Sequence, residues 1–259
     1  MKRNRTRLLN QKDMNSRRKQ SRVDSERCRV LVNYILKHPT LETLDLSHNF
    51  IGDRGARALG KLIAEEGKIR ILNLADNRLQ ATGGLAIAHG LAKKTCQLIR
   101  LNLRLNRLRD DGGIAIAKSL LRNESLRELN LAANDLNESV ANYFAHVIAH
   151  NSTLTHIDMS NNQIGPAGSK KLQDGMERNN TLLHFDLRFT GSSQEAEYSI
   201  CQKVESNQDR LRQIQAEMKR TNSEEILASG DQNNLPTGIT SVANGHSTSS
   251  DHPSAPIAV

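Results

Sequence analysis

Few residues of this sequence have the types and spacing that chemistry requires. His146 and His150 lie four residues apart, as two metal ligands on one helix face would, but no carboxylate or cysteine of the same repeat completes a site. Asp110 and Asp111 form an acidic pair at the start of a predicted helix, where they complement the helix dipole. The sequence has no phosphate-binding loop, nucleophile elbow or zinc-protease helix. We therefore expect a non-catalytic protein with no cofactor, no metal and no small-molecule substrate.

The cysteines and the apolar residues predict a compartment. Cys28, Cys96 and Cys201 are far apart and match no metal-binding or disulfide spacing, so we expect reduced thiols and an intracellular location. The basic residues at the start of the chain are followed by no apolar run, so we expect no signal peptide. No stretch approaches the roughly 20 apolar residues that cross a bilayer, and we expect no membrane insertion.

The net charge of +8 is concentrated near the N-terminus. Residues 1–30 contain 11 Lys or Arg and 3 Asp or Glu, whereas the rest of the chain contains 25 of each. A basic arm favours an acidic surface, such as an anionic membrane or a cytoskeletal polymer, and we do not expect nucleic acid. The alternative is a solvated arm that binds nothing. The residues predicted to contact a polyanion are Arg3, Arg5, Arg7, Arg17, Arg18, Lys19 and Arg22.

One pattern, L-x-x-L-x-L-x-x-N-x-L, recurs along the middle of the chain. Its copies begin at Leu41, Ile69, Leu98, Leu126, Leu154 and Leu182, so the period is 28 or 29 residues. The sixth copy is incomplete, because Thr190 occupies the asparagine slot. Five matches in register establish an internal repeat, and this period is typical of a solenoid whose repeats stack on one another.

Each slot of the repeat has a physical explanation. The alternating L-x-L segment predicts a short strand with its leucines in the core, and apolar residues at helical spacing follow it. The asparagine is expected to bond to main-chain groups of its own turn and of the neighbouring repeat, which forms a ladder. The ladder residues are Asn49, Asn77, Asn106, Asn134 and Asn162. The predicted fold class is α/β: a curved solenoid of about six repeats, with one strand and one helix per repeat and a parallel sheet on the concave face.

The pattern divides the chain into five segments. In order, they are a basic disordered arm at 1–22, an N-terminal capping helix at 23–40, the repeats at 41–190, a C-terminal capping helix at 191–219 and a disordered tail at 220–259. The apolar residues of the first capping helix are Val23, Val30, Leu31, Tyr34 and Ile35, of which Leu31, Tyr34 and Ile35 are expected at the helix slots of a preceding repeat. The second is expected to begin with a capping box formed by Ser192 and Glu195.

Strand side chains between the core positions should face the concave side, where solenoids of this kind bind partners. Exposed arginine and aromatic residues suit interfaces and predict a protein-binding surface there. The alternative is that the Asp and Asn residues of the strands only solvate the sheet. The candidate binding residues are Arg100, Arg104, Leu105, His156, Asp158, His184, Asp186, Arg188 and Phe189.

Residues 24–215 resemble the ribonuclease-inhibitor-like leucine-rich-repeat superfamily, which includes cytosolic innate sensors, the activator of the Ran GTPase and the tropomodulins. Three segments are similar to the family of dynein regulatory complex subunit 5, also called t-complex-associated testis-expressed protein 1. They are LNLRLNRLRDDGG at 101–113, FDLRFT at 185–190 and EAEYSICQKVESNQDR at 195–210. The resemblance implies a scaffold of the axonemal nexin–dynein regulatory complex that supports ciliary or flagellar motility. It implies other subunits of that complex, and tubulin, as partners, and a location in the cytoplasm, cytoskeleton and axoneme.

The resemblance leaves alternatives open. The family is expected to have a substantial region before its repeats, so this chain is expected to be a shortened, divergent or isoform version. A tropomodulin-like binder of actin filament pointed ends also finishes in a degenerate strand and a helix, as FDLRFTGSSQ followed by NQDR does here. No amphipathic actin- or tropomyosin-binding region is recognisable before the repeats. A regulator of GTPases would be expected to have more repeats and an acidic tail.

Overall fold

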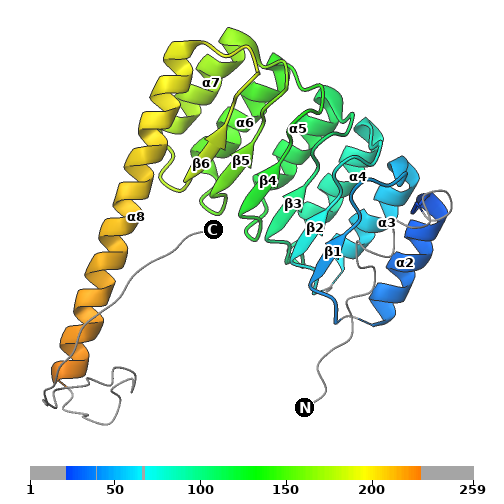
Figure 1. The fold of residues 1–259 in the computed structure, drawn as a ribbon, viewed down its shortest axis with the longest axis horizontal. Helices are drawn as coiled ribbons and strands as arrows, with labels where there is room; N and C mark the ends of the chain where they lie inside the picture. Colours follow the sequence, from blue (N-terminus) through cyan, green and yellow to red (C-terminus); the bar gives the residue numbers. More distant parts are fainter. Residues whose placement is uncertain (1–21, 39, 66–67, 229–259) are drawn as a thin grey trace, which may run out of the picture. The chain divides into compact units, whose positions relative to one another are not determined.

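A computed structural model describes residues 22–38, 40–65 and 68–228, and the side chains of the last helix as far as residue 221. The chain forms two compact units, one ending at Gln213 and one beginning at Ile214. The first unit contains all the repeats (Figure 1). Most of the expected basic arm and tail, residues 1–21 and 229–259, lies outside the described residues.

Six parallel strands of three residues each form one sheet in the order β1 to β6. They are β1 Thr43–Asp45, β2 Ile71–Asn73, β3 Arg100–Asn102, β4 Glu128–Asn130, β5 His156–Asp158 and β6 His184–Asp186. Neighbouring strands pair in register, so the second leucine of each repeat falls in one row: Leu44, Leu72, Leu101, Leu129, Ile157 and Phe185. Each position of the repeat therefore forms a column that crosses the whole sheet.

A helix follows each of the first five strands and lies on the outer side of the curve, while the strands line the inner side (Figure 1). The helices are α2 Ser25–Lys37, α3 Gly52–Ala64, α4 Ala81–Leu91, α5 Arg109–Leu120, α6 Glu138–His150, α7 Gly165–Glu177 and α8 Gln194–Ala228. The predicted fold class is confirmed, with one strand and one helix per repeat and a parallel sheet on the concave face.

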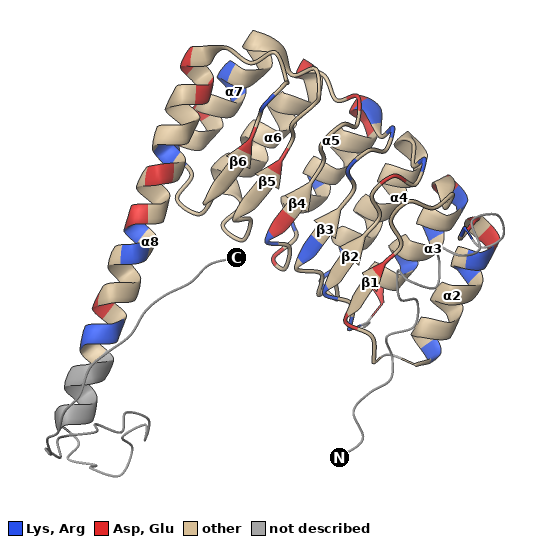
Figure 2. Cartoon of the chain, viewed as in Figure 1, with Lys and Arg blue, Asp and Glu red and all other residues tan. Residues whose placement is uncertain are grey.

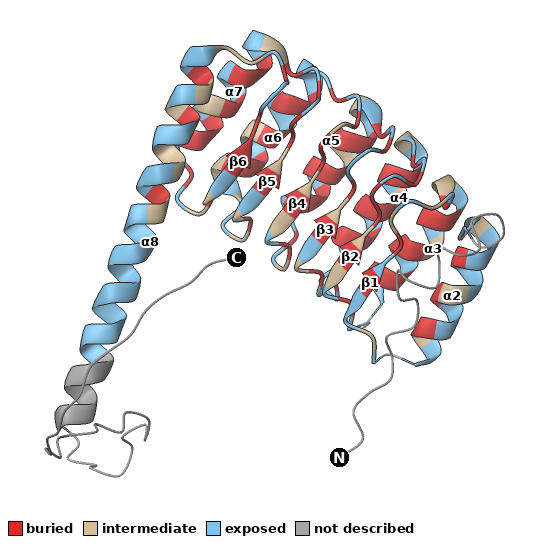
Figure 3. Cartoon of the chain, viewed as in Figure 1, coloured by how far each residue is buried: buried red, intermediate tan, exposed pale blue. Residues whose placement is uncertain are grey.

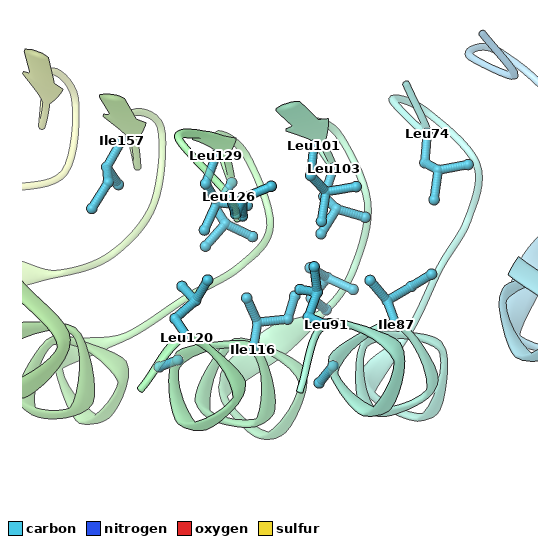
Figure 4. Close-up of a cluster of buried hydrophobic side chains, with 14 of the residues drawn as sticks. Leu74, Ile87, Leu91, Leu101, Leu103, Ile116, Leu120, Leu126, Leu129 and Ile157 are labelled. Atoms are coloured by element: carbon cyan, nitrogen blue, oxygen red, sulfur yellow. The ribbon is translucent and has the colours of Figure 1, made fainter. Parts of the chain in front are cut away.

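A continuous hydrophobic core fills the space between the sheet and the helices (Figure 3). Figure 4 shows Leu101 and Leu129 of two neighbouring strands pointing toward Ile116 and Leu120 of α5. All four side chains are buried. Full burial of such a side chain contributes roughly 1.5–3 kcal/mol. Because each helix packs against its neighbours, stacking completes a core that one repeat could not form alone.

The loops between strands and helices alternate between two conformations. Repeats one, three and five have a positive φ at Gly52, Arg109 and Gly165, whereas repeats two and four have it at Arg78 and Asp135. The left-handed conformation strains a residue with a Cβ atom, and glycine removes that strain at two of the five positions. The repeat length of 28 or 29 residues therefore contains two kinds of turn.

The acidic residues in these loops connect one repeat to the next. Asp110 accepts hydrogen bonds from the main-chain N–H of Asn137 (2.8 Å) and from Ser139 Oγ (2.7 Å), both at the start of α6. Asp53 similarly accepts from the N–H of Gln80 at 2.7 Å, at the start of α4. The sequence interpretation placed the Asp110 charge on its own helix dipole. The structure shows that it also caps the following helix, whose N-terminal N–H groups lack intrahelical partners.

The N-terminal helix buries only part of the apolar face that the sequence predicts. Asp24 caps α2 by accepting from the N–H of Arg27 at 2.9 Å. Cys28, Val32 and Ile35 are buried, while Val30 and Tyr34 are each 63% exposed. The predicted apolar face is confirmed at Ile35, which is buried, and at Val23 and Leu31, which pack against the core. It was wrong at Val30 and Tyr34, and it did not include Cys28 and Val32. Burial among these side chains raises the pKa of the Cys28 thiol to about 12.

The C-terminal helix begins one residue later than the predicted capping box requires. Ser193 Oγ accepts from the N–H of Ala196 at 3.3 Å. Ser192 Oγ instead lies 2.6 Å from Thr190 Oγ1, so the expected box of Ser192 and Glu195 is not formed. Helix α8 continues past the expected boundary at 219 and ends at Ala228. Within the described part of the chain, no helix is long and apolar enough to span a bilayer.

Candidate protein-binding surface

Side chains of the strands, and of the residues that directly follow them, form three columns on the inner face of the sheet. Arg100, His156 and His184 belong to the first column, and all three are exposed. Asp158 and Asp186 belong to the central column. The third column consists of Ser47, Ala75, Arg104, Ala132, Ser160 and Arg188. Arg104 and Arg188 are its only large members, and both are exposed, so they project from a column of otherwise small side chains.

The central column has a structural role that sequence reasoning missed. In every repeat, its side-chain oxygen accepts a hydrogen bond from the main-chain N–H two residues later, over 2.9–3.1 Å. The six acceptors are Asp45, Asn73, Asn102, Asn130, Asp158 and Asp186. Asp and Asn commonly satisfy a nearby N–H in this way where a strand turns. The recurrence of these two residue types two positions before the loop was the available signal.

The candidate binding residues fall into two groups rather than one. Arg100, Arg104 and Leu105 belong to the third repeat, and the other six belong to the fifth and sixth repeats. The fourth repeat separates the groups with Glu128, and its third-column residue is the buried Ala132. Figure 2 shows basic residues on β3 and acidic residues on β4, β5 and β6. A partner that contacts both groups must therefore span the fourth repeat.

Ion pairs and ring contacts link several of these residues. Arg188 binds Asp186 through Nη2 to Oδ2 at 2.6 Å, and its Nε donates to the same carboxylate. The hydrogen bond from Arg188 is the main cause that lowers the pKa of Asp186. The rings of His156 and His184 lie with their centroids 5.9 Å apart. Arg100 lies 3.7 Å from the Glu128 carboxylate, so its charge is partly matched.

Leu105 and Phe189 occupy an unusual backbone position. They have φ angles of +55° and +60°, and the equivalent residues of the other repeats also have positive φ: His48, Asp76, Ala133 and Asn161. Asn and Asp tolerate this conformation, whereas large apolar residues seldom adopt it. Phe189 is nevertheless 81% exposed and Leu105 47% exposed. These two side chains therefore gain little from burial within the chain.

The ladder asparagines lie at the opposite, inner end of the turn. Asn106 donates through Nδ2 to Leu74 O of the preceding repeat (3.0 Å) and to Leu103 O (2.8 Å). Its Oδ1 accepts from the N–H groups of Asn77 and Leu79. The other four residues, Asn49, Asn77, Asn134 and Asn162, make corresponding Nδ2 bonds. Among the described residues, Asn134 Oδ1 is the buried side-chain atom that lacks a partner.

One residue of the predicted polyanion-binding arm packs against the solenoid. The guanidinium carbon of Arg22 lies 4.4 Å from the centroid of the Phe50 ring, and that of Arg78 lies 3.9 Å from the same centroid. Such contacts contribute about 0.5–1 kcal/mol at exposed sites. Arg22 is therefore a structural contact at the first repeat. The remaining arm residues, Arg3, Arg5, Arg7, Arg17, Arg18 and Lys19, lie outside the described residues.

His146 and His150, the pair with the spacing of metal ligands, lie close together on α6. His150 Nδ1 is 2.8 Å from His146 O, and the two rings have centroids 4.2 Å apart. Over residues 22–38, 40–65 and 68–228, no group of three or more His, Cys, Asp or Glu side chains could hold a metal ion.

Comparison with known proteins identifies the repeats. The sequence profile of the family described as "Leucine Rich repeat" matches residues 37–60, 68–88, 96–117 and 150–172. The chain therefore contains leucine-rich repeats. It is 45% identical over 75 residues to dynein regulatory complex subunit 5 of Macaca fascicularis, which covers 29% of this chain and 15% of that protein. The same subunit of Mus musculus is 61% identical over 41 residues, or 16% of this chain and 8% of that protein.

More distant likenesses extend over more of the leucine-rich-repeat chain. Protein NLRC5 of Homo sapiens is 32% identical over 95 residues, which is 36% of this chain and 5% of that protein. The matched segments therefore span at most 15% of the length of these curated relatives. A solved structure of leiomodin-1 actin-binding site 2 superposes with a TM-score of 0.50 and 18% identity, over 75% of this chain and 95% of that one. At this identity the likeness shows a shared fold.

Proposed function

We propose that this leucine-rich-repeat protein is a non-catalytic scaffold of the axonemal dynein regulatory complex. The observation that carries the proposal is the 61% identity over 41 residues to dynein regulatory complex subunit 5. A segment of that length exceeds one 28-residue repeat, so the match extends beyond a single copy of the motif. The leiomodin-1 structure has the same fold at only 18% identity, which shows how little identity the fold itself requires.

The inner face of the sheet is the proposed contact surface for other subunits of the complex and for tubulin. A stacked solenoid is rigid, so little conformational entropy of the scaffold is lost when a partner binds. Exposed arginine and large apolar side chains are the residue types that anchor protein interfaces. Arg104 with Leu105, and Arg188 with Phe189, supply one such pair at each of the two groups.

Extraction of demembranated axonemes tests the location. We expect the endogenous protein to remain with axonemes through mild salt washes and to be released with other subunits of the complex. Loss of the protein is expected to alter waveform or motility while the doublets stay assembled. Release at the first wash together with cytosolic proteins would contradict the proposal.

Charge reversal tests the surface separately. The variant Arg104→Glu with Arg188→Glu is expected to weaken axonemal retention. The matched control, Arg57→Glu with Lys61→Glu, reverses two exposed charges on the outer face of α3 and should retain normally. Normal retention of both variants would be consistent with the axonemal location but would contradict the inner face as the contact surface.

An actin assay addresses the alternative raised by the tropomodulin resemblance. On the axonemal proposal, purified protein should leave the elongation of pyrene-labelled actin from pointed ends unchanged. Inhibition at pointed ends without axonemal retention would overturn the proposal.

A further inference from the structure

The last strand leaves one edge of the sheet unpaired. Strand β6 pairs only with β5, because it is the final strand in the sheet order. Beside it lies a groove of about 510 Å³ between residues 183–188 and the first half of α8. Ile200 and the half-buried Val204 of α8 contribute apolar side chains to the wall of this groove. An open strand edge with an adjacent groove is the setting in which extended peptides add a further strand.

The hydrogen bonds around the groove leave its centre open. Asn207 Nδ2 donates to Leu182 O at 2.9 Å and Gln208 Nε2 donates to Leu183 O at 2.7 Å, which closes one end of the edge. At the other end, Thr190 Oγ1 donates to Leu187 O at 2.6 Å. Within the described part of the chain, the main-chain N–H of Leu187 has no acceptor. The alternation of N–H directions along a parallel strand turns the N–H of Phe185 to the same edge.

The charged groups of the groove favour a basic occupant. Glu197 and Glu205 line it from α8, and neither carboxylate has an ion pair within the described residues. Arg188 also lines it, but its guanidinium already binds Asp186 at 2.6 Å. The uncompensated charge of the groove is therefore negative. A segment with basic residues beside an apolar pair would match both the charge and the apolar wall.

The N-terminal arm has this composition and sufficient length. Residues 1–21 contain eight Lys or Arg and one Asp, and Leu8 and Leu9 follow Arg7. The 13 residues from Leu9 to Arg22 can span about 43 Å when extended. The five strand intervals from β1 to β6 amount to about 24 Å along the sheet. The arm can therefore cross the inner face from the first repeat and reach the last.

We propose that residues 1–21 dock in the groove between β6 and α8 of their own chain, with the segment around Leu8 and Leu9 extended along the free edge of β6. The basic side chains then face Glu197 and Glu205, and the leucines contact the wall formed by Ile200 and Val204. This self-docked arm crosses the inner face of the sheet, so it competes with any partner that binds there. The inference does not depend on the axonemal proposal, because it concerns only this chain.

A natural thiol reports on the groove. Cys201 lines the groove and is exposed, whereas Cys28 and Cys96 are buried. N-ethylmaleimide is uncharged, so the charge of the groove does not attract or repel the reagent. Its reaction rate with Cys201 in the full chain depends on access to the sulfur and on the thiolate fraction, so the rates are compared over a range of pH. We expect Leu8→Asp with Leu9→Asp to accelerate this reaction on the order of fivefold, because a tethered segment at millimolar effective concentration occupies even a weak site. The control Leu8→Ile with Leu9→Ile should react as slowly as the unmodified chain.

Two further results decide the proposal. Amide hydrogen exchange of Phe185 and Leu187 should be slower in the unmodified chain than in the Leu8→Asp, Leu9→Asp variant, because strand addition would pair these groups. Equal Cys201 rates, within twofold, in the unmodified chain and that variant would overturn the docking. Protection of Cys201 that grows with protein concentration would place the arm on a second copy and overturn the intramolecular arrangement.

Discussion

Two columns of Asn and Asp side chains cross this solenoid, and they do different work with similar chemical groups. The ladder asparagines Asn77, Asn106, Asn134 and Asn162 are buried and donate to carbonyls of the preceding repeat. The central column lies on the inner face, and its oxygens accept from the N–H two residues later in the same repeat. The ladder joins neighbouring repeats, whereas the central column shapes the loop of each repeat.

The difference shows that the contribution of a side-chain amide to stability depends on its surroundings more than on its residue type. A buried partner left unpaired loses its hydrogen bond and cannot recover one from water, which costs about 1–3 kcal/mol. On the inner face, water can replace a lost bond. The central column has one bond between repeats, from Asn130 Nδ2 to Asp158 Oδ2 at 2.8 Å. The inner face can therefore vary in sequence for binding while the ladder remains constant.

Replacement of a central ladder residue should have the largest effect. Asn106→Leu removes the partner of the Leu74 and Leu103 carbonyls and of the Asn77 and Leu79 N–H groups. Because these groups are enclosed, we expect the free energy of unfolding to fall by at least about 3 kcal/mol. Urea denaturation of both proteins measures the difference. An unchanged denaturation midpoint would show that the ladder does not hold the repeats together.

The neighbouring ladder residue should matter less. Asn134 Oδ1 has no hydrogen-bond partner. Asn134→Leu therefore removes only the hydrogen bonds that Nδ2 donates to main-chain carbonyls, including the bond to Leu103 O at 2.9 Å. We expect a loss smaller than that of Asn106→Leu by about 1–2 kcal/mol, from the same denaturation series. Equal losses for the two variants would mean that acceptor bonds contribute nothing to the ladder.

Substitutions in the central column should lower the free energy of unfolding less than substitutions in the ladder do. Asn102→Ala removes the bond of 3.0 Å from the N–H of Arg104, on a side chain that is half-buried. We expect a loss of about 1 kcal/mol in the free energy of unfolding, because water can take over part of the bond. Thermal melting beside Asn106→Leu provides the comparison. A loss as large as that of Asn106→Leu would contradict the distinction between the two columns.

The dependence of the free energy of unfolding on pH, at acidic pH, should change when Arg188 is replaced. The bond from Arg188 lowers the folded-state pKa of Asp186 below the unfolded value, so the pair stabilises the fold above that unfolded value, at about pH 4. This contribution is lost as the pH falls through the folded-state pKa. We therefore expect Arg188→Ala to be less stable than the unmodified chain at pH 7, and the difference to shrink below about pH 4. A difference that stays constant from pH 7 to pH 2 would contradict the linkage.

The smallest stability change is expected at the exposed apolar residues. Phe189→Asn places a residue that tolerates positive φ at an 81% exposed position, so the free energy of unfolding should stay within about 0.5 kcal/mol or rise slightly. The reverse change, Asn161→Phe, should destabilise by about 1 kcal/mol, because it introduces the strain that Phe189 carries. Calorimetry on both variants gives the pair of values. A marked loss in Phe189→Asn would indicate that this ring packs within the chain.

The repeat could be recognised in the sequence because it recurs. The residues that depart from the repeat pattern could not be predicted in this way. The rows of core leucines and the fold class followed from spacing alone. The buried face of α2 followed only in part, because Ile35 is in the core as expected but Cys28 and Val32 join it and the apolar Tyr34 remains outside. The helix cap at Ser193 was also missed, since two adjacent serines offer the same chemistry. The choice between them depends on where the chain leaves the sixth strand.

The sequence by itself determined the period, and the period determined which residues stack in each column, because equal repeat lengths return the chain to the same height in a parallel sheet. Only the tertiary structure decided what the polar members of those columns bind. It gave Asn106 acceptor and donor partners in two repeats, left Asn134 Oδ1 without one, and turned Asp110 toward the next helix. The physical reason is that these bonds join groups about 30 residues apart in sequence, across a contact that exists only after the repeats have stacked.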